Sequence, residues 1–131
     1  MTSESAVSQH AQYALTGFGG LAMRNNVGVA IDQTGRHIRY GLMNESSKIN
    51  KEYKSSDLID CVPIVSQPHH VGRVFGLFVA LETKESNWKL LPSDKHGAAQ
   101  QAFMNLIRQR GGAADFITNA EQVKQILEFY K

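Results

Sequence analysis

An apolar run that ends in charge is the feature that most constrains the fold of this chain. The stretch "FGLFVALETK", residues 75–84, is apolar at most positions and ends with Glu82 and Lys84. Continuous apolar character is typical of a strand whose two faces are both covered. Residues two positions apart on a strand point to the same face. The chain therefore has to bury the strand predicted for residues 73–84 while presenting a carboxylate and an ammonium group together at its end.

The rest of the chain predicts helices and further strands around this run. Apolar spacing predicts helices over residues 3–15, 99–110 and 118–130, the last with a capping box formed by Thr118 and Glu121. The remaining predictions are strands at 27–32, 36–42, 57–65 and 113–117, turns at 32–35 and 66–72, and an exposed, lysine-bearing loop at 43–56. This order is typical of a mixed α/β domain.

Length and composition exclude several classes of protein. The 131 residues correspond to one domain, residues 1–131. The single cysteine, Cys61, allows no internal disulfide and fits a reducing compartment. The apolar run is too short to span a membrane, and "MTSESAVSQH" lacks the layout of a secretory signal, so we expect a cytoplasmic protein. A net charge of +2 permits nucleic-acid binding without arguing for it.

A second carboxylate gives the charged strand end a chemical interpretation. If residues 57–65 and 73–84 form a hairpin, Asp57 faces Glu82, with Cβ atoms about 4.5–5.5 Å apart. Two carboxylates at that distance repel each other unless a cation lies between them. Hard oxygen ligands suit Mg²⁺ or Mn²⁺. Lys84 would then lie beside the metal, where it could orient a water molecule or stabilise charge on a phosphate.

Ordinary alternatives exist for several of these residues. Glu82 and Lys84 could form a plain ion pair. His69 and His70 are adjacent in a turn and give no zinc-ligand spacing, so we expect them to be solvated. Trp88 could stack on a base or anchor its loop, and we prefer the anchor.

Four segments resemble the virus-type replication-repair nuclease (VRR-NUC) family, in its stand-alone phage or bacterial form. They are "SSDLID" (55–60), "ALETK" (80–84), "QQAF" (100–103) and "RGGAADFI" (110–117). The resemblance runs from about Glu4 to Val123. Since this family belongs to the PD-(D/E)xK nucleases, it implies a restriction-endonuclease-like αβββαβ core with a mixed central sheet flanked by helices. The chain departs from the family pattern at Ser56, at Asp60 and in a longer segment 86–99.

The resemblance implies roles for particular residues. Asp57 and Glu82 would bind the metal, with the Thr83 carbonyl as a third oxygen, and Lys84 would serve catalysis. Gln100 and Glu4 match a glutamine and a first-helix acid near the family's active site. From the residues alone, Gln100 is an exposed helix residue and Glu4 an acid favoured by the helix dipole.

Five further residues are candidates for contacting DNA. The matching segment "RNNVG" contributes Arg24 and Asn26. Lys48, Lys51 and Lys54 precede Asp57 in the chain and could contact phosphates, although a lysine-bearing loop is often only solvated.

The resemblance implies a Mg²⁺- or Mn²⁺-dependent, structure-selective DNA endonuclease. Stand-alone family members resemble enzymes that resolve four-way (Holliday) junctions in DNA recombination and repair, which implies a homodimer in the cytoplasm of a bacterial or phage-infected cell. Three alternatives remain: a catalytically quiet module that binds branched DNA, a flap- or nick-directed nuclease, and a ligand-binding domain that needs no metal.

Overall fold

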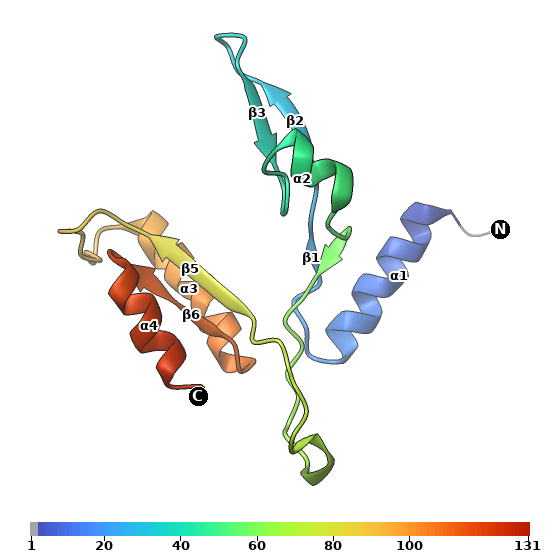
Figure 1. Ribbon diagram of the computed structural model, residues 1–131, viewed down its shortest axis with the longest axis vertical. Helices are drawn as coiled ribbons and strands as arrows, with labels where there is room; N and C mark the ends of the chain where they lie inside the picture. The colour runs from blue at the N-terminus through green and yellow to red at the C-terminus, as the bar shows by residue number, and fades with distance from the viewer. Residues whose placement is uncertain (1–2) are drawn as a thin grey trace. The chain divides into compact units, whose positions relative to one another are not determined.

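A computed structural model describes residues 3–131 of the chain (Figure 1). Within these residues the chain forms four α-helices, one short 3-10 helix and six short strands. It divides into two compact units, Met1–Val62 and Pro63–Lys131. The prediction of a mixed α/β protein is confirmed. The strands pair as three two-stranded sheets, so the described residues do not form the expected mixed central sheet.

The first helix of the first unit begins where the sequence predicts it. Helix α1 spans Glu4–Gly17, and the Ser3 side chain caps it by accepting a hydrogen bond from the Ala6 amide at 3.2 Å. The chain turns after the helix at Gly19, whose φ of +87° lies in the left-handed region that favours glycine. Glu4 therefore lies in the first helical turn, as expected.

The predicted strand pair in the first unit is also confirmed. Strands β2 (Gly28–Ile31) and β3 (His37–Tyr40) form an antiparallel hairpin. Asp32 organises the turn, because its carboxylate accepts hydrogen bonds from the Thr34 and Arg36 amides, both at 2.9 Å. A hydrogen bond from the Thr34 hydroxyl contributes most to lowering the pKa of Asp32 below its usual value, followed by the Arg36 amide.

The loop predicted for residues 43–56 contains a helix, which corrects the sequence interpretation. Helix α2 spans Ser47–Glu52, and the Ser46 side chain caps it by accepting a hydrogen bond from the Ile49 amide at 3.3 Å. Ile49 is half-buried, while Lys48 and Lys51 remain exposed. One short apolar contact and a serine cap therefore order a segment whose composition is mainly polar.

The predicted hairpin between residues 57–65 and 73–84 is wrong. Strand β4 is limited to Leu58–Ile59 and pairs with β1 (Met23–Arg24) in an antiparallel ladder. Pro63 follows shortly afterwards and has no amide proton to donate to a ladder. Residues 63–69 and 71–76 are exposed, and the 3-10 helix η1 (Pro68–His70) occupies the expected turn. Among the described residues, no strand ladder therefore pairs Asp57 with Glu82 as the predicted hairpin required.

The second unit is a parallel strand pair joined by a helix. Strand β5 (Val79–Thr83) pairs with β6 (Ala113–Ile117), from Val79 opposite Ala113 to Thr83 opposite Ile117. Parallel neighbours need a long crossover connection, and helix α3 (Lys95–Gln109) provides it. Figure 1 shows α3 and α4 (Ala120–Glu128) alongside this pair. The most buried apolar residues here are Met104, Ile107, Ala113 and Ala114.

Two predicted boundaries in the second unit shift. Strand β5 is shorter than predicted, because residues 73–76 are exposed and Val74 is 99% exposed. Helix α4 is capped by Asn119, which accepts a hydrogen bond from the Gln122 amide at 3.0 Å. The Thr118 amide donates to Gln122 Oε1 at 2.7 Å. The predicted capping box of Thr118 and Glu121 is therefore wrong. The cap lies one residue later, at Asn119, because asparagine caps a helix as well as threonine does.

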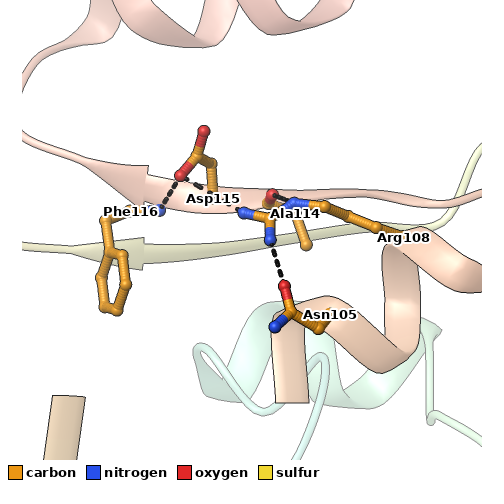
Figure 2. Close-up of polar contacts among 5 residues, drawn as sticks. All are labelled: Asn105, Arg108, Ala114, Asp115 and Phe116. Atoms are coloured by element: carbon orange, nitrogen blue, oxygen red, sulfur yellow. Dashed lines mark hydrogen bonds and ion pairs between the residues drawn. The ribbon is translucent and has the colours of Figure 1, made fainter. Parts of the chain in front are cut away.

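Arg108 ties α3 to β6. Its Nε donates to the Ala114 carbonyl at 2.7 Å, and its Nη1 donates to Asn105 Oδ1 at 2.7 Å. Asp115 Oδ1 also accepts from the Phe116 amide at 2.8 Å. Figure 2 shows the side chains of Asp115 and Phe116 on opposite sides of the strand. The helix is therefore fixed along the strand that carries Phe116.

Among residues 3–131, no helix combines the length and the apolar character needed to cross a membrane.

The burial of Ile107 gives a test of the second unit's core. Ile107 is 0% exposed, whereas its neighbour Leu106 is 41% exposed. We expect Ile107→Ala to lower the free energy of unfolding by about 2–5 kcal/mol, and the control Leu106→Ala to lower it by less than about 1 kcal/mol. Urea unfolding followed by the fluorescence of Trp88, the single tryptophan, measures both. Equal losses would contradict the described core.

Candidate functional site

Glu82, Lys84 and Gln100 lie together in the second unit, and we call them the lysine cluster. Lys84 Nζ donates a hydrogen bond to Gln100 Oε1 at 2.9 Å and lies 3.9 Å from Glu82 Oε1. The Lys84 side chain is 17% exposed and that of Glu82 is 39% exposed. The structure therefore brings three of the predicted catalytic residues into contact. It also contains the ion pair proposed as the ordinary alternative.

The secondary structure explains why these side chains meet. Glu82 is near the end of β5, and Lys84 directly follows that strand, its amide donating to the Ile117 carbonyl at 2.9 Å. Ligands of open α/β sheets commonly bind at the carboxyl ends of the strands. Gln100 reaches Lys84 from α3, the crossover helix between β5 and β6. The βαβ connection thus delivers a helix side chain to the charged strand end.

A cavity of about 360 Å³ opens beside this cluster. It is lined by Ala80, Leu81, Glu82, His96, Ala99, Gln100, Phe103 and Met104. The sequence interpretation missed His96. Its position one helical turn before Gln100 was the available signal, because residues four apart on a helix lie on the same face.

Two aromatic rings complete the surroundings of Lys84. Its Nζ lies 5.1 Å from the centroid of the Trp88 ring and 5.7 Å from that of Phe116. The two rings are in contact, with centroids 4.5 Å apart. No local signal in the sequence connects Phe116 with Lys84. Trp88 packs on β6, which supports the preferred prediction that it anchors its loop.

A second group of predicted residues shares a cavity in the first unit. Glu4, Arg24, Asn26 and Asp57 all line a cavity of about 410 Å³, and we call them the aspartate cluster. Ser5, Ser8 and Asn25 complete the lining. These residues come from α1, from β1 and the segment after it, and from the segment before β4. Residues far apart in the sequence, and predicted separately, are therefore neighbours here.

Asn25 holds the segments of this cavity together. Its Nδ2 donates to Ser55 Oγ at 2.7 Å and to the Ser56 carbonyl at 2.9 Å, and its Oδ1 accepts from the Leu42 amide at 3.1 Å. Its own amide donates to the Asp57 carbonyl at 2.8 Å. Asn25 therefore fixes the backbone that carries Asp57. The sequence interpretation had selected its neighbour Asn26.

The three candidate lysines are placed differently. Lys54 lines a larger cavity of about 490 Å³ that also includes Asp57, Asn25 and Asn26. Lys48 and Lys51 lie on α2, three residues apart and exposed, and neither is part of these cavity linings. The structure thus brings Lys54 near the aspartate cluster and leaves the other two on the helix surface.

Asp60, a departure from the family pattern, has a structural role in the first unit. Its Oδ1 accepts hydrogen bonds from the Leu21 amide at 2.6 Å and from the Cys61 amide at 2.7 Å. These bonds join the segment after α1 to the segment after β4. Asp60 therefore holds the backbone in place and is not a member of the aspartate cluster.

The two adjacent histidines have different surroundings. His70 Nδ1 accepts a hydrogen bond from the Gln67 amide at 2.9 Å, and His69 is exposed. Among the described residues of either unit, no three His, Cys, Asp or Glu side chains lie close enough to hold a metal ion. A metal bound at either cluster would need carbonyl, amide or water oxygens as further ligands.

The available donors match a hard cation in their chemistry. Asp57, Glu82 and the Thr83 carbonyl all present oxygen atoms, which Mg²⁺ and Mn²⁺ prefer as ligands. Both Asp57 and Thr83 are exposed, so they remain accessible to an ion. Softer metals such as zinc would favour sulfur and imidazole ligands, and none of these three donors supplies such a group. The chemistry of each donor is therefore of the kind that Mg²⁺ or Mn²⁺ prefers.

In comparisons with known proteins, no family model, no curated protein and no solved structure matches the chain.

Proposed function

We propose that this chain is a metal-dependent, structure-selective DNA endonuclease that cuts four-way junctions. One observation carries the proposal. The residues that the nuclease resemblance names separately fall into two groups, the lysine cluster (Glu82, Lys84 and Gln100) in one unit and the aspartate cluster in the other. Lys84 and Gln100 are 16 residues apart in the sequence and their side chains are hydrogen-bonded, which supports the proposal.

The proposed metal ligands are those that the nuclease resemblance implies. Asp57 and Glu82 would bind Mg²⁺ or Mn²⁺, with the Thr83 carbonyl as a third oxygen. When bound, such an ion supplies positive charge at the phosphate and favours deprotonation of a water molecule. The carboxylates have hydrogen-bonding neighbours suited to this task, because Gln100 and Lys84 lie beside Glu82. This arrangement keeps the lysine near the reacting phosphate without making it a ligand.

Lys84 supplies charge and hydrogen-bond donors in this proposal. An ammonium group has three N–H donors, and the bond to Gln100 uses one of them. The separation of 3.9 Å from Glu82 is too long for a hydrogen bond. The remaining donors are therefore available to the attacking water and to a phosphate oxygen, where they stabilise the charge that develops during hydrolysis.

Gln100 and Glu4 have supporting roles. Gln100 accepts from Lys84 and so holds the ammonium group at the end of β5. Glu4 shares the cavity of Asp57 and adds negative charge there, which favours a bound cation. Neither residue needs to contact the phosphate for these effects.

The cationic residues near Asp57 would hold the DNA backbone. Arg24, Asn26 and Lys54 share cavity linings with Asp57. Lys48 and Lys51 lie one turn apart on the exposed surface of α2, where they can contact successive phosphates. Contacts to phosphates fix the position of a protein on DNA and carry no sequence information directly. Recognition by the shape of a branched substrate follows from such contacts.

Cutting a junction symmetrically calls for two active sites, so we propose a homodimer. A four-way junction presents two equivalent strands, and each chain supplies one set of site residues. The β2–β3 hairpin is the proposed contact surface, because it carries exposed apolar side chains on both faces. Val29 and Ile31 lie on one face and are 53% and 66% exposed, and Ile38 and Tyr40 lie on the other and are 42% and 47% exposed. Apolar side chains at this exposure are suited to the centre of an interface between subunits.

Removing either proposed metal ligand should abolish cleavage. We expect Asp57→Asn and Glu82→Gln to leave no measurable nicking of a synthetic four-way junction in Mg²⁺ or Mn²⁺, because each removes a charged oxygen ligand. Binding of the junction should persist. The matched control Glu128→Gln changes an exposed carboxylate that pairs with Lys131, and it should cut like the unchanged chain. Gel assays with and without metal, on the junction and on linear duplex, measure these effects.

The same assay distinguishes the alternatives. Near-normal cleavage by either variant under saturating metal would refute the ligand assignment. Junction binding without cleavage by the unchanged chain would favour the quiet DNA-binding module. Preferential cutting of flaps or nicks would favour a nuclease directed to those structures. Absence of both DNA binding and metal dependence would favour a ligand-binding domain.

Loss of the lysine should reduce turnover and spare metal binding. We expect Lys84→Ala to cut on the order of a hundredfold more slowly, the scale of a lost electrostatic or acid–base group. Metal affinity should be unchanged or higher, because a positive charge next to the site is removed. Calorimetric metal titration and single-turnover cleavage separate the two effects, and Lys124→Ala, an exposed lysine on α4, is the control. Weakened metal binding with little kinetic loss would indicate that Lys84 is only part of a structural ion pair.

The proposed dimer predicts a mass and a mutational effect. Light scattering at micromolar concentration should give about twice the chain mass of 14.5 kDa. Ile31→Lys, which introduces charge on the hairpin, should shift the protein toward monomer, whereas Leu91→Lys, at a residue 60% exposed in the other unit, should not. Dimers mixed with Glu82→Ala chains should nick one strand and seldom resolve the junction. A monomeric mass both free and on DNA, with efficient resolution, would contradict the dimer.

A further inference from the structure

We propose that Trp88 and Phe116 are positioning residues that hold the Lys84 ammonium group in place for DNA cleavage. This inference rests on the proposed nuclease function and deepens it. Trp88 lies outside the four segments that carry the nuclease resemblance, whereas Phe116 lies within one of them (110–117), and the resemblance implies no role for either ring. They act on the reaction through Lys84 and do not themselves contact the reacting atoms.

The contacts of Lys84 carry the inference. Its Nζ lies 5.1 Å from the Trp88 centroid and 5.7 Å from the Phe116 centroid, both within the range of about 6 Å in which a cation is attracted to a ring face. The side chain is only 17% exposed. Limited contact with water strengthens such an attraction. Two rings and Gln100 thus surround the charged end of the side chain.

The two rings are themselves held in place. Phe116 lies directly opposite Glu82 in the parallel register, so both side chains are on the same face of the strand pair. The strand that carries Phe116 is held by the bond from Arg108 to the Ala114 carbonyl and by the bond from the Phe116 amide to Asp115 (Figure 2). Trp88 follows a tight turn, in which its amide donates to the Glu85 carbonyl at 3.0 Å. The Trp88 ring then packs on Phe116 with centroids 4.5 Å apart.

Aromatic rings suit this task because they attract a cation without using one of its N–H donors, as a hydrogen-bond acceptor would. A third carboxylate in their place would compete for the N–H donors of Lys84. A bound divalent cation would also draw the charge of Glu82 away from Lys84, leaving Gln100 and the rings to hold it. Trp88 and Phe116 therefore keep the ammonium group near the strand end while its remaining donors stay available to substrate.

The competing explanation is that Trp88 only anchors its loop. Both explanations predict loss of stability when the ring is removed, so stability alone cannot decide between them. A positioning role predicts in addition that the ring matters only while Lys84 is present. A double-mutant cycle measures this dependence.

The first measurement is kinetic and uses the full-length chain. We expect Trp88→Leu to slow single-turnover cleavage of a four-way junction in Mg²⁺ by about three- to thirtyfold, the rate equivalent of one cation–π contact. Junction affinity should be unchanged, and Trp88→Phe should recover most of the rate. In the Lys84→Ala background, Trp88→Leu should have no further effect. Phe129→Leu, which removes an aromatic ring 84% exposed on the same unit, is the matched control.

The second measurement does not depend on cleavage. With ¹³C-labelled lysine, the ε-methylene signal of Lys84, assigned by its loss in Lys84→Arg, should be shifted upfield by the two rings. The shift should move toward those of the other lysines in Trp88→Leu and be unchanged in Phe129→Leu. Circular dichroism confirms that each variant is folded.

Each outcome bears on the proposal. An unshifted Lys84 signal overturns the contact. A shifted signal with normal cleavage by Trp88→Leu, or with an equal rate loss in the Lys84→Ala background, overturns the positioning role and leaves Trp88 as an anchor. A shifted signal in a chain that cleaves no DNA overturns the proposed nuclease function, and the positioning role with it. The NMR result therefore separates failure of the contact from failure of the proposed function.

Discussion

The parallel ladder between Val79–Thr83 and Ala113–Ile117 is the constraint on which the second unit depends. A parallel pair requires a crossover helix, and that helix brings Gln100 to Lys84 and buries Ile107 beneath the strands. The same register sets Phe116 opposite Glu82. One pairing of backbones therefore determines both the core and the surroundings of the charged strand end.

Local signals in the sequence predicted much of this structure. Helix α1 with its serine cap, the β2–β3 hairpin and strand β6 could all be predicted, because each depends on caps, turns and apolar spacing within a few residues. The charged pattern at Glu82 and Lys84 likewise predicted that these side chains would lie together. Gln100 came from the family resemblance, and its hydrogen bond to Lys84 required the helix to cross over the strands.

The pairing of strands that are distant in the sequence could not be predicted from such local signals. The hairpin predicted for residues 57–65 and 73–84 assumed that neighbouring apolar runs pair with each other, whereas β4 pairs with β1 and β5 with β6. A run of apolar residues specifies burial but does not specify the partner strand. Helix α2 was missed because Ser46 and Ile49 are weak signals within a polar segment. The contact of Lys84 with Phe116 was missed because it depends on long-range pairing: the two residues meet through the parallel register of β5 and β6.

The two acids of the motif have different environments, which bears on how a site of this kind would work. Glu82 already has a cation beside it, so its charge is partly balanced before any metal binds. Asp57 is exposed and shares its cavity with Glu4 as well as Arg24, so negative charge there is balanced less specifically. A lysine held only by Glu82 would be free to leave whenever that carboxylate paired with another cation. The bond to Gln100 and the two aromatic rings do not involve the charge of Glu82, so they would hold the ammonium group at the strand end independently of its carboxylate partner.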